Sequence, residues 1–118
     1  MIVYLHSKCS TCKQALSFLE KKGIAFELKD IVKEPPSYEE LEKMVGFYKG
    51  DVKKILNTSG LLYREMGLSL KLKEMQKGEI IALLSTQGML IKRPFVISKQ
   101  FGLVGFKEKE WGDIFSAR

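Results

Sequence analysis

The chain has 118 residues, of which 45% are apolar, and its net charge is +6 at pH 7. This size and composition are ordinary for a globular protein with a single core, and we expect one domain over residues 1–118. The lysines are scattered among acidic residues, no apolar run approaches the roughly 18 residues that cross a bilayer, and no basic segment precedes a long apolar one at the start. We therefore expect a cytoplasmic protein with no direct nucleic-acid binding, no membrane span and no secretory signal.

The N-terminal part of the chain has a strand-helix-strand pattern. Residues 2–5, IVYL, form a continuous apolar run, which is typical of a strand buried on both faces. Apolar residues at helical spacing then predict a helix that starts at the cysteines and ends before Gly23, a residue that suits a helix C-terminus. Residues 24–31, IAFELKDI, predict a second strand, and this order implies a right-handed parallel crossover.

A helical insertion is expected next, at about residues 37–86. Pro35 and Pro36 break the chain, and Ser37 with Glu40 three residues later predicts a capped helix start. Pieces of helical periodicity separated by glycines predict short helices over residues 50–78, and residues 79–88, EIIALLSTQG, predict one more. We interpret these helices as a subdomain inserted into the domain.

The C-terminal part has the pattern of a hairpin followed by a helix. Residues 92–98, KRPFVIS, and 101–106, FGLVGF, predict two strands joined by Lys99 and Gln100. Residues 107–115, KEKEWGDIF, predict a helix that buries Trp111, Ile114 and Phe115. The whole order predicts an α/β fold with a four-stranded mixed sheet flanked by helices.

The two cysteines have the spacing C-x-x-C and come between the first strand and the first helix. A helix N-terminus stabilises negative charge and lowers the pKa of a thiol, and Lys8 and Lys13 add nearby positive charge. Cys9, at the mouth of the loop, is expected to be the exposed and acidic thiol. Cys12, one turn further on, is placed to resolve a mixed disulfide or sulfenic acid formed on Cys9.

Three other roles for the cysteines compete with redox chemistry. His6, Cys9 and Cys12 offer three soft ligands, but structural zinc sites use four and the chain has no other Cys or His, so no metal is expected. His6 is expected to line the loop. Inert core cysteines would suit an apolar segment, whereas these flank Ser10 and Thr11. A structural disulfide is disfavoured because the cytosol is reducing and the loop is short.

The chain resembles the ArsC/Spx family of thioredoxin-like proteins. The resemblance covers nearly the whole chain and depends on four segments, which are CSTCKQALSFLE, ILNTSGLLYREMGL, LLSTQGMLIKRPFVIS and LVGFKEKEW. It implies a thioredoxin/glutaredoxin-like three-layer fold, with the helical insertion between an N-terminal βαβ part and a C-terminal ββα part. It also implies that the Arg93–Pro94 peptide is cis and faces the cysteine loop.

The resemblance also assigns site residues. Cys9 matches the catalytic cysteine of the family, and Arg93 matches an arginine that binds an oxyanion in arsenate reductases. The second cysteine, Cys12, resembles the Spx-like branch, because the arsenate reductases have one cysteine in this loop. A guanidinium suits that role because it binds a tetrahedral oxyanion at two points and favours a neighbouring thiolate. The face that binds a substrate or thiol is expected to include four further residues, which are Lys8, Ser10, Thr11 and Pro94.

Several positions depart from the arsenate reductases. Asn57 stands where the insertion of those enzymes is expected to carry a further arginine, and residues 104–110, VGFKEKE, contain none. Arg64 is the only candidate substitute, and we expect it to be an exposed helix residue. Because arsenate and the charge that develops on its reduction need several fixed cations, these departures count against efficient arsenate reduction.

The sequence therefore leaves three functions to compare. The first is a cytosolic thiol-disulfide redox protein, similar to arsenate reductases, that needs no cofactor beyond a redox-active Cys9–Cys12 disulfide. Its reductant would be glutaredoxin, thioredoxin or a low-molecular-weight thiol. The second is an Spx-like redox-sensing transcriptional regulator that binds the C-terminal domain of the RNA polymerase α subunit, with Gly50 near the partner-binding place. The third is an arsenate reductase that uses glutathione and glutaredoxin.

Overall fold

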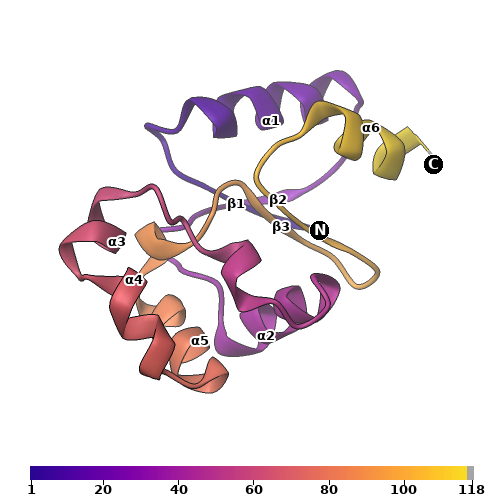
Figure 1. The fold of residues 1–118 in the computed structure, drawn as a ribbon. Helices are drawn as coiled ribbons and strands as arrows, with labels where there is room; N and C mark the ends of the chain where they lie inside the picture. Colours follow the sequence, from indigo (N-terminus) through magenta and orange to yellow (C-terminus); the bar gives the residue numbers. More distant parts are fainter. Residues whose placement is uncertain (117–118) are drawn as a thin grey trace.

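The computed structural model describes residues 1–116 of the chain. Figure 1 shows a central sheet with helices on both faces. The strands are β1 (Ile2–Leu5), β2 (Glu27–Asp30), β3 (Phe95–Ile97) and β4 (Gly102–Val104). The α-helices are α1 (Ser10–Lys21), α2 (Tyr38–Phe47), α3 (Leu61–Glu65), α4 (Leu68–Lys71), α5 (Lys77–Thr86) and α6 (Glu108–Ser116). Three short 3₁₀ helices are η1 (Val52–Ile55), η2 (Leu72–Glu74) and η3 (Gly88–Leu90).

The four strands form one mixed sheet, as the sequence predicted, and their order in the sheet is β2-β1-β3-β4. β1 pairs parallel with β2, and the pairs β1/β3 and β3/β4 are antiparallel. The β3–β4 hairpin closes where the Ser98 N–H donates to the Phe101 carbonyl at 3.0 Å, so Lys99 and Gln100 make the turn. The parallel crossover from β1 through α1 places the start of α1 at one edge of the sheet, where the cysteines lie.

Strand β2 is shorter than predicted. The alternating pattern predicted a strand over residues 24–31, whereas only Glu27–Asp30 pairs with β1. Ile24 and Phe26 still pack, partly buried, against the core beneath α1. Pairing is limited by β1, whose four residues match the four residues of β2 one to one.

The sheet separates two cores, because neighbouring strand residues face opposite sides. Val3 faces the layer of α1 and α6, where the fully buried Trp111 donates from Nε1 to the Gly105 carbonyl at 3.2 Å. Tyr4 faces the layer of α2 to α5 and donates its hydroxyl to Glu40 at 2.7 Å. The result is the expected three-layer arrangement, with α1 and α6 on one face and the inserted helices on the other (Figure 1).

The inserted helices are attached to the sheet beside the Arg93–Pro94 segment. Helix α2 begins with the predicted capping box of Ser37 and Glu40. Further along, the Asn57 N–H donates to the Leu90 carbonyl at 2.8 Å, and the Lys92 N–H donates to the Ile55 carbonyl at 2.9 Å. These bonds fix the segment after η1 against the chain that leads into β3. Over residues 1–116, no helix combines the length and apolar character that a membrane span requires.

Helix α6 buries most of the predicted side. Trp111 and Phe115 are buried and Ile114 is partly buried, and all three contact the core shared with α1.

Candidate functional site

Cys9 is the N-cap residue of α1. Its backbone is extended, with φ −95° and ψ 114°, and its sulfur accepts a hydrogen bond from the Cys12 backbone N–H at 3.2 Å. The Cys9 N–H donates to the His6 carbonyl at 3.1 Å, which closes the loop between β1 and α1. The C-x-x-C spacing therefore places the Cys9 sulfur where an N-cap side chain satisfies a free helix N–H and meets the positive end of the helix dipole.

The two thiols differ in acidity. Burial alone would raise the pKa of Cys9, but hydrogen bonds from the thiol and backbone N–H of Cys12, together with the Arg93 guanidinium, outweigh it and lower the pKa of Cys9. Burial and the hydrogen bond to Cys9 raise the pKa of Cys12 to about 12. Cys12 is 1% exposed, whereas Cys9 is partly exposed. Cys9 is thus the more acidic and the more accessible thiol of the pair, and the thiolate is the reactive form of a cysteine.

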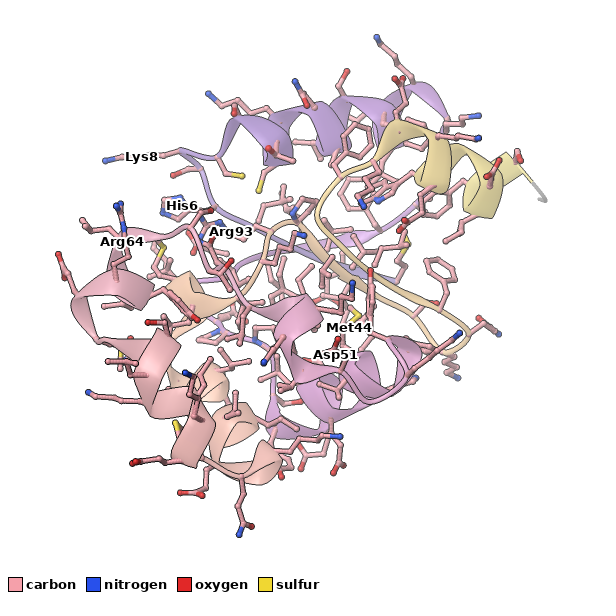
Figure 2. All side chains as sticks on the ribbon, in the orientation of Figure 1. His6, Lys8, Met44, Asp51, Arg64 and Arg93 are labelled. Atoms are coloured by element: carbon pink, nitrogen blue, oxygen red, sulfur yellow. The ribbon has the colours of Figure 1, made fainter. Side chains whose placement is uncertain are left out.

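Arg93 and Pro94 lie beside the cysteine loop, and the peptide bond between them is cis. Arg93 contributes both a hydrogen bond and positive charge to Cys9, and its Nη1 lies 3.5 Å from the Met89 sulfur. Pro94 is buried, and its carbonyl accepts a hydrogen bond from the Gly105 N–H at 2.9 Å. Figure 2 shows Arg93 between the inserted helices and the loop before α1.

A cleft of about 310 Å³ opens over the Cys9 sulfur. Its cationic side chains are Lys92, Arg93 and Lys107, and the other lining residues are Cys9, Thr11, Asn57, Val104, Gly105 and Phe106. The cleft therefore combines an acidic thiol with three positive charges that come from two separate segments of the chain. Such an arrangement favours anionic or thiolate-containing substrates.

Lys92 and Lys107 were missed by the sequence reasoning, which looked for cations among the arginines and among the lysines next to the cysteines. Lys92 precedes Arg93 directly, and Lys107 lies in the loop after β4. Gly105 makes room for Lys92, because a Cβ on Gly105, at φ +74°, would lie 3.1 Å from the Lys92 Cε. The KRP triplet and the KEK triplet were the available signals. Whether those lysines reach Cys9 depends on how the two loops approach each other.

The other expected site residues lie at the border of the cleft or outside it. Thr11 lines the cleft, whereas Lys8 and Ser10 are exposed and are not among the cleft-lining residues. Figure 2 shows Lys8 directed away from the body of the molecule. Arg64 is an exposed residue of α3, as expected, and does not line the cleft.

His6 lines a second cavity, of about 440 Å³, on another side of α1. This cavity is mostly apolar and also contains Cys12, Leu16 and Leu28. The two sulfurs therefore border different cavities. Within residues 1–116, no three His, Cys, Asp or Glu side chains gather as a metal site would require.

Gly50 lies in the insertion, just after α2, and does not line the cleft. Its φ of +84° is a conformation that glycine adopts more readily than other residues. A Cβ at this position would lie 3.3 Å from the Lys77 Nζ.

Comparison with known proteins places this geometry in a family. Residues 4–114 match the model of the ArsC family. The chain is 42% identical over 108 residues to the uncharacterized protein YusI of Bacillus subtilis, covering 92% of both chains. It is 27% identical over 108 residues to the global transcriptional regulator Spx of Streptococcus agalactiae, covering 92% of this chain and 77% of Spx.

Solved structures agree with this assignment. A protein from Bacteroides fragilis described only as related to the ArsC family superposes with a TM-score of 0.88 at 42% identity, covering 96% of this chain and 95% of the other. A possible arsenate reductase from Streptococcus mutans superposes with a TM-score of 0.84 at 32% identity, covering 93% and 95%. The fold is thioredoxin-like, and the chain belongs to the ArsC family.

Proposed function

We propose that this protein is a cytoplasmic thiol-disulfide redox protein in which Cys9 attacks and Cys12 resolves. The observation that carries the proposal is the asymmetry of the pair. The Cys9 sulfur caps α1 with a lowered pKa and borders an open cationic cleft, while the pKa of Cys12 is raised to about 12 one helical turn below it.

The first step forms a mixed disulfide. The Cys9 thiolate attacks one sulfur of a substrate disulfide, the S–S bond of the substrate breaks, and the other half leaves as a thiolate. Lys92, Arg93 and Lys107 line the same cleft and would stabilise a negative charge on the substrate or on the leaving thiolate.

The second step uses Cys12. Hydrogen bonding to Cys9 and the charge of Cys9 are two of the causes that raise the pKa of Cys12, and both are lost when Cys9 is bound in a mixed disulfide. Cys12 then releases its proton more readily, attacks the Cys9 sulfur and expels the substrate as a thiolate. The product is the Cys9–Cys12 disulfide, and the substrate has been reduced by two electrons.

An external thiol completes the cycle. Glutaredoxin, thioredoxin or a low-molecular-weight thiol would reduce the Cys9–Cys12 disulfide, which is the only redox group that the proposal requires. Thr11 and Pro94 help to shape the face on which this thiol would bind.

The test is reduction of 2-hydroxyethyl disulfide, with glutathione as reductant and NADPH consumption by glutathione reductase as readout. The parent chain should sustain turnover and Cys9→Ser should abolish it. Cys12→Ser should instead accumulate a mixed disulfide on Cys9, visible as a mass increase by one substrate half. Turnover that survives Cys9→Ser would remove the assignment.

A second candidate function is an Spx-like redox-sensing regulator that binds the RNA polymerase α subunit. The similarity to Spx of Streptococcus agalactiae over 92% of this chain favours it. In this function the Cys9–Cys12 disulfide would act as a switch, and Gly50 would belong to the partner-binding surface of the insertion.

Pull-down with the purified C-terminal domain of the α subunit separates the two functions. Gly50→Arg should abolish binding, and Gly67→Arg is the matched control because Gly67 also lies in the insertion at positive φ, +62°, with open space around it. The regulator hypothesis fails when the parent chain captures nothing in either redox state, or when both variants lose binding equally.

A further inference from the structure

A wide cavity lies as a groove between α1 and the start of α6, which we call the α1–α6 groove. Its volume is about 830 Å³. One wall is the outer side of α1 and its C-cap residue, and the other is the chain that enters α6. The lining residues are Lys13, Gln14, Ser17, Phe18, Lys21, Lys22, Phe106 and Glu108.

The groove is cationic at both ends of its α1 wall. Lys13 lies one turn into α1, and Lys21 and Lys22 lie at its end, while Glu108 is the only acidic lining residue. Within residues 1–116, none of these lysines has a carboxylate within 4.0 Å, and the salt bridge that the structure contains joins Lys29 and Glu27 instead. No carboxylate of the described residues therefore competes for these three charges, and the Lys22 Nζ lies over the Phe18 ring, 5.5 Å from its centroid.

Between the lysines the groove is aromatic. Phe18 and Phe106 are partly buried and meet edge to face with their ring centroids 5.7 Å apart. Both rings also pack against the buried Trp111, at 6.0 and 4.9 Å. The groove thus presents an apolar centre flanked by positive charge, which is the complement of a segment with an apolar side chain flanked by carboxylates.

The groove lies next to the redox cleft. Phe106 lines both cavities, and the Lys13 N–H donates to the Cys9 carbonyl at 3.2 Å. The rise of an α-helix places Phe18 roughly 13 Å along the axis from Cys9, a span that about four extended residues cover. A single peptide segment can therefore reach the Cys9 sulfur and occupy the groove.

We propose that the α1–α6 groove binds an acidic segment of the protein that exchanges disulfides with Cys9. This inference depends on the proposed thiol-disulfide function and names the chemistry of its protein partner. Carboxylates of the segment pair with Lys13 at one end and with Lys21 and Lys22 at the other, and an apolar side chain packs on Phe18 and Phe106.

A nucleic acid fits the groove less well. Base stacking needs an open aromatic face, whereas Phe18 and Phe106 are engaged with each other and with Trp111. The acidic peptide is the occupant that the charges and the aromatic centre together favour.

Binding is tested without thiol chemistry, in a chain that carries both Cys9→Ser and Cys12→Ser. The probe is the fluorescein-labelled peptide Glu-Phe-Glu-Glu, compared with Lys-Phe-Lys-Lys by fluorescence anisotropy. The acidic peptide should bind, the basic one should not, and salt should weaken binding. Trp111 fluorescence should change on binding, because Trp111 is the single tryptophan and contacts both phenylalanines.

Charge variants locate the binding site. Lys21→Gln with Lys22→Gln should weaken binding of the acidic peptide by at least about threefold, the loss expected for two exposed ion pairs. Lys54→Gln with Lys71→Gln is the matched control, since these exposed lysines lie outside the groove. Equal losses in the two pairs would overturn the proposal, and so would stronger competition by a single-stranded oligothymidylate than by the unlabelled acidic peptide.

The coupling to Cys9 is tested in the parent chain with activated disulfides. The probes are pyridyl disulfides of Cys-Gly-Ser-Gly-Glu-Phe-Glu-Glu, of the same peptide with lysines for glutamates, and of 2-mercaptoethanol. Cys9 attacks the peptide sulfur, pyridine-2-thione leaves and is measured by absorbance, and Cys12 then releases the peptide thiol. The acidic peptide should react fastest, and Lys21→Gln with Lys22→Gln should remove that advantage without slowing the mercaptoethanol probe.

The outcomes separate the two proposals. If the mercaptoethanol probe reacts but the acidic and basic peptides react at the same rate, the groove proposal fails and the redox function stands. If no probe reacts, the redox function fails, and the groove proposal fails with it as a site for a disulfide-exchange partner.

Discussion

Gly88→Ala should disrupt both the fold and the redox site. Gly88 begins η3, the segment that leads into Lys92 and Arg93, and a Cβ there would lie 1.8 Å from the carbonyl oxygen of Ile31. Real Cβ atoms essentially never approach closer than 3.0 Å, so η3 and the chain after β2 must separate by about 1.2 Å. Both partners are backbone in buried positions, and no rotamer change can relieve the contact.

The loss in the free energy of unfolding can be estimated from the measured effects of overpacking in protein cores. Forcing an extra methyl group into a packed interior costs about 1–3 kcal/mol, and a contact between backbone segments belongs at the upper end, about 3 kcal/mol. For a chain of this size that lowers the melting temperature by about 12 °C. Displacement of η3 also moves Met89, which contacts Arg93, so alkylation of Cys9 at neutral pH should slow as its pKa rises.

The assay is chemical and thermal unfolding followed by circular dichroism, with iodoacetamide alkylation of Cys9 on the same samples. Gly112→Ala is the matched control, because Gly112 lies within α6 with nothing within 4 Å of an added Cβ. It should stabilise the chain by about 0.5–1 kcal/mol, since alanine has less backbone freedom to lose than glycine. An unfolding free energy of Gly88→Ala within about 0.5 kcal/mol of the parent would refute the reasoning.

Three further predictions concern charge and protonation. The free energy of unfolding should fall as the pH rises above about 10, because burial and Glu40 raise the pKa of Tyr4 in the folded chain, so that the unfolded chain loses the phenolic proton first. In urea titrations at a series of pH values, Tyr4→Phe should make this fall smaller. Lys107→Gln should slow the reaction of Cys9 with the dianionic disulfide of thionitrobenzoate by about two- to fivefold, and should leave its rate with a neutral disulfide unchanged. Lys109 lies outside the cleft, so an equal effect of Lys109→Gln would contradict this prediction. In the folded chain, Cys9 should be alkylated at pH values well below the ordinary pKa of a thiol, because its pKa is lowered. In urea, where the chain is unfolded, this reactivity at low pH should be lost.

The redox pair could be predicted from the sequence because its geometry is local. Two residues separate Cys9 from Cys12, and the first helix begins at this segment, so the N-cap position of the Cys9 sulfur follows from the chain itself. The capping box of α2 is local in the same sense. The mixed character of the sheet also followed, since a short strand-helix-strand unit predicts a parallel pair and a two-residue hairpin an antiparallel one.

The features that the sequence did not predict depend on contacts between distant segments. The first and last residues of β2 depend on pairing with β1, and the pattern of residues 24–31 alone does not predict where that pairing begins and ends. Lys92 and Lys107 line one cleft only because the Pro94 carbonyl binds the Gly105 N–H and brings their loops together. The same approach creates the wall of the α1–α6 groove at Phe106.

The arrangement of the two sulfurs implies an order of events. Cys12 is buried, borders an apolar cavity and has a raised pKa, so an external disulfide meets only Cys9. The groove and the cationic cleft both lie on the side of Cys9 and share Phe106. In the proposed mechanism, a partner held there would be attacked before Cys12 becomes reactive, because Cys12 loses the hydrogen bond and the charge of Cys9 only once the mixed disulfide has formed. Oxidation of the pair would thereby be coupled to binding of a partner, and oxidation of Cys12 on its own would be suppressed.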